Sequence, residues 1–364
     1  MDPGRDRTIS KRASERWKKA VAGTTHCLMM RPDWDNMTWQ VLLFGCTIAE
    51  RLRRRGNEIL IISPDMFRTI PCPTYNEVRL AITPGRRTAD ALKSFRPDAI
   101  HIATEGPIGG AARRYCLANG LPFTTAYHSK FPEFVHARTR LPLSWLYERL
   151  RRFHEPSQAV MVPSSNVMRE LESRGFKNLR LWSHGVDTDV FKPGAKTYLD
   201  DVGPTRPLFM FIGRMAIDKN LPAFLDLDLP GSKAVVGSGP ARDTLVKKYP
   251  DVTFRIADGD AELSRYFNAA DVFVFPSLTD TFGLVMLEAL ACGVPVAAFP
   301  VTGPEDVLGG SRAGCLDTDL RRAALAALEI PSGVCRAHAM TFTWDRVVDE
   351  FVEFLAPIRR EAAA

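Results

Sequence analysis

Short β-rich runs alternate with helix-like segments along this chain, in two series with an interruption between them. In the first series, residues 58–64 (EILIISP), 98–104 (DAIHIAT) and 159–164 (AVMVPS) are separated by segments of helical composition. The second series extends from residues 208–213 (LFMFIG) to residues 294–300 (VPVAAFP). Strands that alternate with helices are typical of parallel sheets covered by helices. The sequence therefore predicts an α/β protein with two doubly wound units, and 364 residues are enough for both.

The interruption near residues 192–207 is rich in Gly, Pro and Asp, which favours an irregular connection. We expect it to be the hinge between a first domain, residues 1–192, and a second domain, residues 193–345. Residues 1–30 form a basic extension of the first domain. Residues 346–364 are expected to form a C-terminal helix that packs back on the first domain.

The positive net charge of the chain is concentrated in its first part. Residues 1–200 carry 32 Lys and Arg against 20 Asp and Glu, whereas residues 201–364 carry 16 against 22. The basic part predicts an anionic partner. An acidic membrane surface fits better than nucleic acid, because no nucleic-acid-binding motif is found. A merely solvated basic surface is the alternative interpretation.

The sequence lacks the patterns of metal-binding, membrane-spanning and secreted proteins, which bears on the class of protein and its compartment. The seven cysteines have no metal-ligand spacing, which predicts reduced thiols rather than a disulfide framework or a zinc site. The longest apolar runs are about half of the roughly 18 to 20 residues that a membrane-spanning helix needs. The N-terminus is basic but has no apolar core of a secretory signal. We therefore expect a cytoplasmic protein.

Residues 138–154 (RTRLPLSWLYERLRRFH) combine Leu, Trp and Tyr with six basic side chains, His154 included. This composition is typical of a helix lying in a membrane interface. A helix that buries its Leu and Trp in the protein core fits the same pattern equally well.

Glycines and cations follow the expected strands of the second domain, where open α/β folds bind ligands. Gly213, Arg214 and Lys219 follow one strand, and Gly237 and Gly239 follow the next. A guanidinium and an ammonium beside flexible backbone suit the oxygens of a diphosphate. Two surface cations paired with neighbouring acids are the alternative.

Residues 279–298 (TDTFGLVMLEALACGVPVAA) read as a loop, a helix and a buried strand. Asp280 precedes the free amides of the helix N-terminus, which favour an anion. Glu288 on the helix could accept hydrogen bonds from a ribose. The alternatives are a helix N-cap for Asp280 and a surface acid for Glu288. The residues expected to present backbone amides or to contact the donor are Phe282, Gly283, Leu284 and Val285.

The motifs together resemble glycosyltransferase family 4, whose members retain the anomeric configuration. Residues 280–288 resemble the family's E-x7-E signature with Asp in the first position, and residues 213–220 (GRMAIDKN) resemble its phosphate motif. Residues 183–191 (SHGVDTDVF) and 342–348 (FTWDRVV) are similar to its interdomain segment and C-terminal helix start. A narrower likeness to bacterial enzymes that glycosylate diacylglycerol, and to related mannosyl- and sulfoquinovosyltransferases, lies in residues 67–81, 100–116 and 124–138.

The resemblance implies a GT-B fold, with two Rossmann-like domains facing a central cleft, and a front-face, oxocarbenium-like transfer without a cofactor or essential metal. The expected donor is UDP-glucose or UDP-glucuronate, and the expected acceptor is a lipid such as diacylglycerol at the inner face of the cytoplasmic membrane, where the protein binds peripherally. A soluble enzyme that acts on a sugar or small molecule, for example with GDP-mannose, is one alternative. A nucleotide-sugar-binding relative without catalysis is the other.

Matching positions carry the family's residue roles. Asp280 corresponds to the acid that holds the sugar's 3-hydroxyl, and Glu288 to the one that holds the ribose. His128 corresponds to the His near the 6-hydroxyl and the reaction centre; a structural hydrogen-bonding His is the alternative. Arg214 and Lys219 neutralise the leaving diphosphate and complete the expected catalytic set with His128 and Asp280.

The remaining expected contacts lie at other strand ends. Thr104, Glu105 and Gly106 line the acceptor side, for which a helix-capping turn is the alternative. Arg255 and Ile256 lie next to the nucleotide base.

The N-terminal region departs from the family pattern. Family members have a glycine-containing loop after the first strand, whereas no glycine lies between Gly23 and Gly45 here. Without glycine, the backbone of residues 31–40 should not approach the diphosphate closely. We hypothesise that the donor still binds through the second domain while transfer is slow or absent, which replacement by a glycine-containing loop would test.

Overall fold

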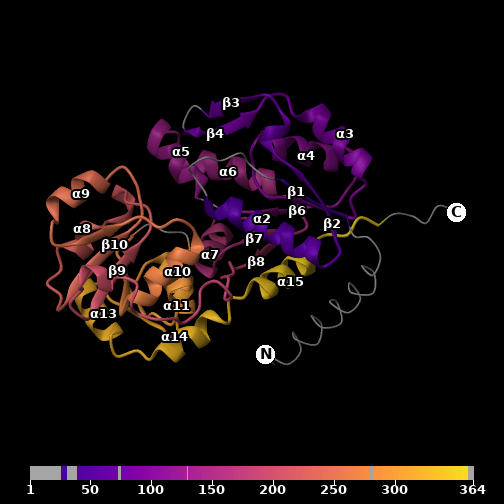
Figure 1. The fold of residues 1–364 in the computed structure, drawn as a ribbon. Coiled ribbons are helices and arrows are strands. Elements are labelled where there is room, and N and C mark those ends of the chain that lie inside the picture. Colours follow the sequence, from indigo (N-terminus) through magenta and orange to yellow (C-terminus); the bar gives the residue numbers. More distant parts are fainter. Residues whose placement is uncertain (1–25, 31–38, 73–74, 129, 279–281, 360–364) are drawn as a thin grey trace. The chain divides into compact units, whose positions relative to one another are not determined.

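The computed structural model describes residues 26–30, 39–72, 75–128, 130–278 and 282–359. The chain divides into two compact units (Figure 1). The first unit contains the residues up to Trp182 and those from Val347 onward, and the second contains Ser183–Arg346. Each unit is described by itself below.

The first unit is built from parallel strands with intervening helices and one antiparallel hairpin, β3–β4. In chain order its elements are β1 (His26–Met30), α2 (Trp39–Arg54), β2 (Glu58–Ile62), η1 (Pro64–Met66), β3 (Thr69–Cys72), β4 (Tyr75–Ala81), α3 (Gly85–Phe95), β5 (Ala99–Ile102), α4 (Pro107–Ala118), β6 (Thr124–Ala126), α5 (Phe131–Thr139), α6 (Leu143–His154), β7 (Val160–Val162), α7 (Ser165–Ser173) and β8 (Leu179–Leu181).

The main sheet of the first unit has the strand order β2-β1-β5-β6-β7-β8, and every neighbouring pair is parallel. The direction of the strand order reverses between β1 and β5. Ligands of open α/β sheets bind at such a reversal, beyond the carboxyl ends of the strands. In this unit the loop after β5 therefore lies at the favoured edge, while residues 31–38, which follow β1, lie outside the described residues.

The second unit repeats the plan with η2 and η3 as short connecting turns. Its elements are η2 (Asp200–Val202), β9 (Leu208–Ile212), η3 (Ile217–Lys219), α8 (Pro222–Leu225), β10 (Ser232–Val236), α9 (Arg242–Lys248), β11 (Thr253–Arg255), α10 (Asp260–Ala269), β12 (Val272–Phe275), α11 (Leu284–Ala291), β13 (Val296–Ala298), α12 (Thr302–Leu308), β14 (Gly314–Leu316), α13 (Leu320–Ala327) and α14 (Ser332–Ala339). A final helix, α15 (Trp344–Phe354), begins in this unit and continues into the first.

The sheet of the second unit is parallel throughout, in the order β11-β10-β9-β12-β13-β14. Alternate residues of β9 face opposite sides, as the two-residue period of a strand requires. Phe209 and Phe211 belong to the core cluster under α8, α9 and α13, whereas Met210 and Ile212 belong to the cluster under α10, α11 and α12. Both faces of the sheet are buried, so its strands read as continuous apolar runs. The strand order reverses between β9 and β12.

The Pro-rich stretch near residues 192–207 is not the place where the units divide. The Gly194 amide donates to Asn268 Oδ1 at 2.6 Å, and Arg206 Nη1 contacts Asp271 Oδ2 at 2.9 Å. The Tyr198 hydroxyl donates to Glu262 Oε1 at 2.7 Å. Side chains of α10, and that of Asp271 just before β12, thus anchor the stretch to the second unit, and composition alone does not reveal these contacts.

The C-terminal segment packs on the first unit. The Trp182 indole donates to the Val347 carbonyl at 2.9 Å and stacks on Phe351 with ring centroids 5.0 Å apart. The Ile358 amide donates to the carbonyl of Asp98 at 2.7 Å, beside a bridge to the start of β5. Aromatic stacking and backbone pairing together hold residues 347–359 against this sheet.

Candidate functional site

The residues of the second unit that the sequence predicts to bind the donor lie at the carboxyl ends of β9, β10 and β11, and in α11 and the residues just before it. β9 ends at Ile212 and is followed by Gly213, whose φ is +150°. Arg214 follows with an exposed side chain, and the turn η3 then presents Lys219. β9 and α11 adjoin the point at which the strand order reverses. The predicted phosphate residues are thus gathered at the edge of the sheet that favours a ligand.

Gly237 and Gly239 have a packing role that the sequence interpretation did not anticipate. A Cβ on Gly237 would lie 2.1 Å from the Gly213 carbonyl oxygen, and one on Gly239 would lie 2.4 Å from that of Met215. Both glycines also have φ above +140°. They let the loops after β9 and β10 interlock, so this backbone is closely held rather than flexible.

Arg214 has an ion-pair partner in this structure. Its Nη2 lies 3.0 Å from both carboxylate oxygens of Asp218, with side-chain exposures of 59% and 45%. The alternative interpretation from the sequence, a surface pair, is thus what the structure shows. A pair this exposed contributes about 0 to 1 kcal/mol, so an anion can displace Asp218. Lys219 Nζ lies 6.0 Å from the ring centroid of Phe275, at the end of β12.

The first turn of α11 presents backbone amides at the same edge. Gly283 precedes the helix with φ +82°, which favours glycine. Phe282 is buried and stacks on His184, with ring centroids 4.8 Å apart and planes 28° apart. The stacking fixes the entry of the chain into the helix, where the first amides lack intrahelical acceptors. Asp280 lies outside the described residues, so its predicted role stays a prediction.

Glu288, in the middle of α11, is partly buried and is not a simple surface acid. Burial, and secondarily the negative charge of Asp260, raises the pKa of Glu288 to about 8. A carboxyl with such a pKa is protonated at neutral pH and can both donate to and accept from a hydroxyl.

Of the two expected base neighbours, Arg255 is the last residue of β11 and Ile256 follows it. Arg255 Nη2 lies 3.7 Å from Asp201 Oδ2, and Arg255 Nη1 donates to the carbonyl of Phe254 at 3.2 Å. The Ile256 side chain is 57% exposed. Arg255 is thus oriented, while Ile256 offers an apolar surface at this strand end.

The residues of the first unit that the sequence predicts to line the acceptor side follow β5 and β6. Thr104 and Glu105 form the turn after β5, and Gly106 is the N-cap residue of α4. Gly106 makes no side-chain hydrogen bond to the helix, but its carbonyl accepts from the Gly110 amide at 2.8 Å, so the alternative of a helix-capping turn also fits these residues. His128 follows β6 and lies near Glu105, whose charge acts on its pKa. The structure thus brings Glu105 and His128 together from separate strand ends.

Burial keeps the histidines of this sheet edge neutral. Desolvation lowers the pKa of His128 to about 4, although the charge of Glu105 acts in the opposite direction. Desolvation, with the charge of His128, lowers the pKa of His101 to about 3. A neutral His128 imidazole can exchange hydrogen bonds with a hydroxyl, but it supplies no positive charge at pH 7.

His154 is a buried member of the site that the sequence interpretation placed among surface cations. Its side chain is 1% exposed, its Nε2 donates to Glu105 Oε1 at 3.0 Å, and its Nδ1 lies 2.8 Å from Thr125 Oγ1. Thr125 in turn contacts Ser157. His154 therefore orients Glu105. Only its place at the end of an amphipathic helix, with Tyr147 and Leu150 on the same side, could have indicated burial.

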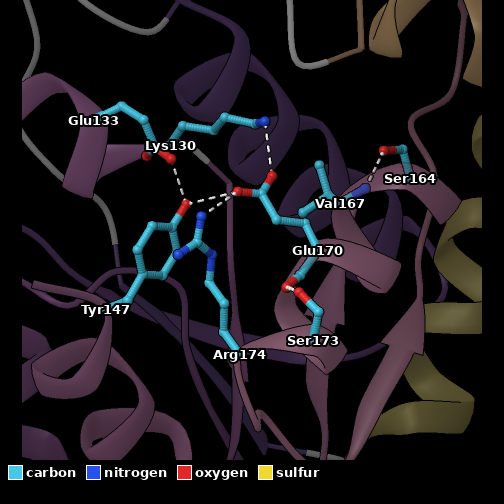
Figure 2. Close-up of polar contacts among 8 residues, drawn as sticks. All are labelled: Lys130, Glu133, Tyr147, Ser164, Val167, Glu170, Ser173 and Arg174. Carbon is cyan, nitrogen blue, oxygen red and sulfur yellow. Dashed lines mark hydrogen bonds and ion pairs between the residues drawn. The ribbon is translucent and has the colours of Figure 1, made fainter. Parts of the chain in front are cut away.

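A polar cluster ties the three helices that follow β6 and β7 (Figure 2). The Tyr147 hydroxyl on α6 donates to Glu133 Oε1 at 2.5 Å, and its oxygen also lies 3.1 Å from Glu170 Oε1. Lys130 and Arg174 also bind Glu170, at 2.8 and 3.1 Å. Burial acts to raise the pKa of Glu170, but these hydrogen bonds outweigh it and lower the pKa. The cluster fixes the start of α5, which follows His128 closely in the chain.

Two adjacent glycines of α4, Gly109 and Gly110, differ in whether the turn that carries Glu105 leaves space for a Cβ atom. A Cβ on Gly109 would lie 1.9 Å from the Thr104 carbonyl oxygen, whereas one on Gly110 would meet only the end of the Arg114 side chain at 3.7 Å. We expect Gly110→Ala to stabilise the protein by up to about 1 kcal/mol, through helix propensity. Gly109→Ala should destabilise it by about 2 kcal/mol through overpacking. Chemical denaturation measures both, and equal stabilisation by the two variants would contradict the contact.

Within the described ranges, no three His, Cys, Asp or Glu side chains lie together as metal ligands. In the same ranges, no helix has both the length and the apolar composition needed to cross a bilayer.

Comparison with known proteins identifies the fold. Sucrose-phosphate synthase of Thermosynechococcus elongatus matches with a TM-score of 0.71 at 19% identity, over 90% of this chain and 97% of the other. Anabaena HepE in complex with UDP and glucose matches with a TM-score of 0.66 at 13% identity, over 90% and 98% of the two chains. The fold is GT-B, with two Rossmann-like doubly wound domains.

Sequence comparison gives the family. Residues 45–190 match the model described as Glycosyltransferase Family 4, and residues 206–329 match that of Glycosyl transferases group 1. The chain belongs to glycosyltransferase family 4.

The names of the relatives state different transferred groups or substrates. A sulfoquinovosyl transferase of Arabidopsis thaliana is 30% identical over 294 residues, which cover 72% of this chain and 57% of that relative. A GDP-mannose-dependent alpha-mannosyltransferase of Mycobacterium tuberculosis is 29% identical over 299 residues, covering 74% and 77%. A D-inositol 3-phosphate glycosyltransferase of Mycobacterium marinum is 33% identical over 211 residues, covering 48% and 44%.

Proposed function

We propose that the protein transfers a hexose or hexuronate from a nucleotide sugar to a lipid acceptor, with retention of the anomeric configuration. The expected donor is UDP-glucose or UDP-glucuronate, and the expected lipid is one such as diacylglycerol. The observation that carries the lipid assignment is a cavity of about 860 Å³ in the first unit. Its wall is largely apolar, and it reaches the expected acceptor residues Glu105 and Gly106.

The second unit supplies a set of groups suited to the donor. Arg214 and Lys219, with the first amides of α11, would neutralise the leaving diphosphate without a metal ion. Positive charge at these positions stabilises the developing negative charge more than it stabilises the bound substrate, which favours the transition state. Glu288, protonated at neutral pH, would both donate to and accept from the ribose hydroxyls.

The first unit would position the acceptor hydroxyl. Neutral His128 can exchange hydrogen bonds with a sugar hydroxyl at the reaction centre. Glu105, oriented by His154, would hold the acceptor side. We propose that the protein works as a peripheral protein on an anionic membrane, where such an acceptor is found.

A soluble, phosphate-bearing acceptor is the second candidate. Arginines line the same cavity, and one relative is named for an inositol phosphate. The test incubates the protein with labelled UDP- and GDP-sugars and either total bacterial lipid or soluble polyol phosphates. A lipid product of the expected mass, with its anomeric configuration retained by NMR, supports the proposal. Transfer to soluble acceptors alone would replace it with the second candidate.

A further inference from the structure

The cavity of the first unit lies among α4, α5 and α6, and much of its apolar lining faces water. Phe131, Leu141 and Trp145 line it and are 45%, 41% and 53% exposed. Val135 and Leu146 add to the same wall. Large apolar side chains left exposed around a concave surface mark a binding site for an apolar group. The cavity volume of about 860 Å³ lies within the range of ligand-binding pockets in proteins, which is roughly 300 to 1,000 Å³.

Arginines of α4 and α6 surround this apolar wall, and two of them already serve the fold. Arg113 donates through Nε to the carbonyl of Phe153 at 2.8 Å and through Nη2 to that of Arg152 at 2.9 Å. These bonds tie α4 to the last turn of α6. Arg152 itself pairs with Glu148 at 2.7 Å.

The other two arginines of the cavity have no such use. Arg114 and Arg149 are exposed and have no ion-pair partner among the described residues. Glu105 is the acidic side chain among the described residues that line the cavity, and it receives a hydrogen bond from His154. The cavity thus combines an apolar wall with two guanidinium groups that no carboxylate of the described residues pairs with.

We propose that this cavity binds an anionic phospholipid with a hydroxyl-bearing headgroup, and that this lipid is the acceptor. One acyl chain lies along Phe131, Leu141 and Trp145, and the phosphate binds Arg114 and Arg149 in the bidentate manner of guanidinium groups. The headgroup hydroxyl then points to the Glu105 end of the cavity. This inference rests on the proposed function and narrows its acceptor from a neutral diacylglycerol to a charged lipid.

Charge complementarity selects this occupant over a neutral lipid. Diacylglycerol would fill the apolar wall but leave both guanidiniums without a partner. A soluble polyol phosphate would pair with the guanidiniums but leave the exposed aromatic and aliphatic side chains in water. A phospholipid satisfies both parts of the cavity.

Binding can be measured without turnover through the fluorescence of Trp145. The protein is mixed with vesicles that contain phospholipids brominated on the acyl chains, and quenching is compared with that of Trp145→Phe. Phosphatidylglycerol and phosphatidic acid should quench Trp145, since both carry an unshielded negative phosphate. Brominated phosphatidylcholine, alone or with diacylglycerol, should not. Equal quenching by phosphatidylcholine, or no quenching that depends on Trp145, overturns the proposal.

A matched set of arginine variants separates the cavity from general surface charge. Arg114→Ala/Arg149→Ala should weaken vesicle binding by about 10-fold or more, because charge-assisted hydrogen bonds to the phosphate are lost. Arg169→Ala, on α7 outside the cavity, should weaken it by about 3-fold or less. If both variants lose the same vesicle affinity for each positive charge removed, the protein only adsorbs to the anionic surface, and the proposed phospholipid site is wrong.

Turnover then tests the acceptor class with four lipids. Phosphatidylglycerol has both charge and hydroxyls, phosphatidic acid has charge alone, diacylglycerol has a hydroxyl alone, and phosphatidylcholine has neither net charge nor hydroxyl. We expect a product from phosphatidylglycerol that the double arginine variant forms about 10-fold or more slowly. Equal turnover of diacylglycerol by both proteins overturns the inference and leaves the proposed function intact. Quenching without any glycolipid product would instead remove the proposed function and the acceptor role together, while the lipid site itself stands.

Discussion

The protein should lose stability as the pH rises from about 5 to about 9, and Glu288→Gln should remove most of this loss. The folded state raises the pKa of Glu288 from 4.5 to about 8. Between these values the folded state binds the proton more tightly than the unfolded chain does. The contribution of protonated Glu288 to the free energy of unfolding is therefore fully present below the pKa of the unfolded chain. It is lost as the pH rises through the pKa of the folded state. The loss is up to about 4 kcal/mol, because each pKa unit corresponds to about 1.4 kcal/mol.

Urea unfolding midpoints at pH 5, 7 and 9 measure this effect. Glu329→Gln, an exposed acid of the same unit, is the control and should follow the wild type. Curves for wild type and Glu288→Gln that stay parallel across the three pH values would show that Glu288 is charged throughout. The same substitution, compared with Glu288→Ala, tests the proposed contact of Glu288 with the ribose. The Gln side chain keeps a hydrogen-bond donor group and an acceptor group. Glu288→Gln should therefore weaken the binding of the nucleotide sugar far less than Glu288→Ala does at pH 6.

The architecture could be predicted because it depends on local patterns. Both sheets are formed by apolar runs of strand length, and the segments between them have the composition of helices. Once the strands are parallel, the residues that follow them must gather at one edge of each sheet. This is why Gly213, Arg214 and the start of α11 were found together from the sequence.

The contacts that the sequence did not predict join residues far apart in the chain. His154 contacts Glu105 because the end of α6 lies beside the turn after β5. The local hydrophobic pattern of either segment does not predict this contact. Tyr147 is bonded to Glu170 across two helices for the same reason. Gly237, after β10, lies against the carbonyl oxygen of Gly213, after β9, and leaves no space for a Cβ atom. This requirement depends on how β9 and β10 pair, which the sequence does not give.

The largest loss of turnover should come from removing both cations of the second unit that are proposed to bind the diphosphate, Arg214 and Lys219. Arg214→Ala and Lys219→Ala should each lower turnover by roughly 10- to 100-fold, because a charge-assisted hydrogen bond contributes about 1.5 to 3 kcal/mol. The double variant should lose roughly 1000-fold if both groups stabilise the same leaving diphosphate. Lys247→Ala, an exposed cation on α9, serves as the control and should keep nearly full turnover.

Stability distinguishes this phosphate role from a structural one. Arg214 pairs with Asp218 in an exposed ion pair, so its removal should change the free energy of unfolding by less than about 1 kcal/mol. Asp218→Asn separates the two roles further, since it frees Arg214 without removing it. If Asp218 only competes with the diphosphate, Asp218→Asn should bind UDP about 2- to 5-fold more tightly, because the exposed pair contributes about 0 to 1 kcal/mol. Weaker UDP binding in Asp218→Asn would mean that the pair instead holds Arg214 in the geometry that the phosphate needs.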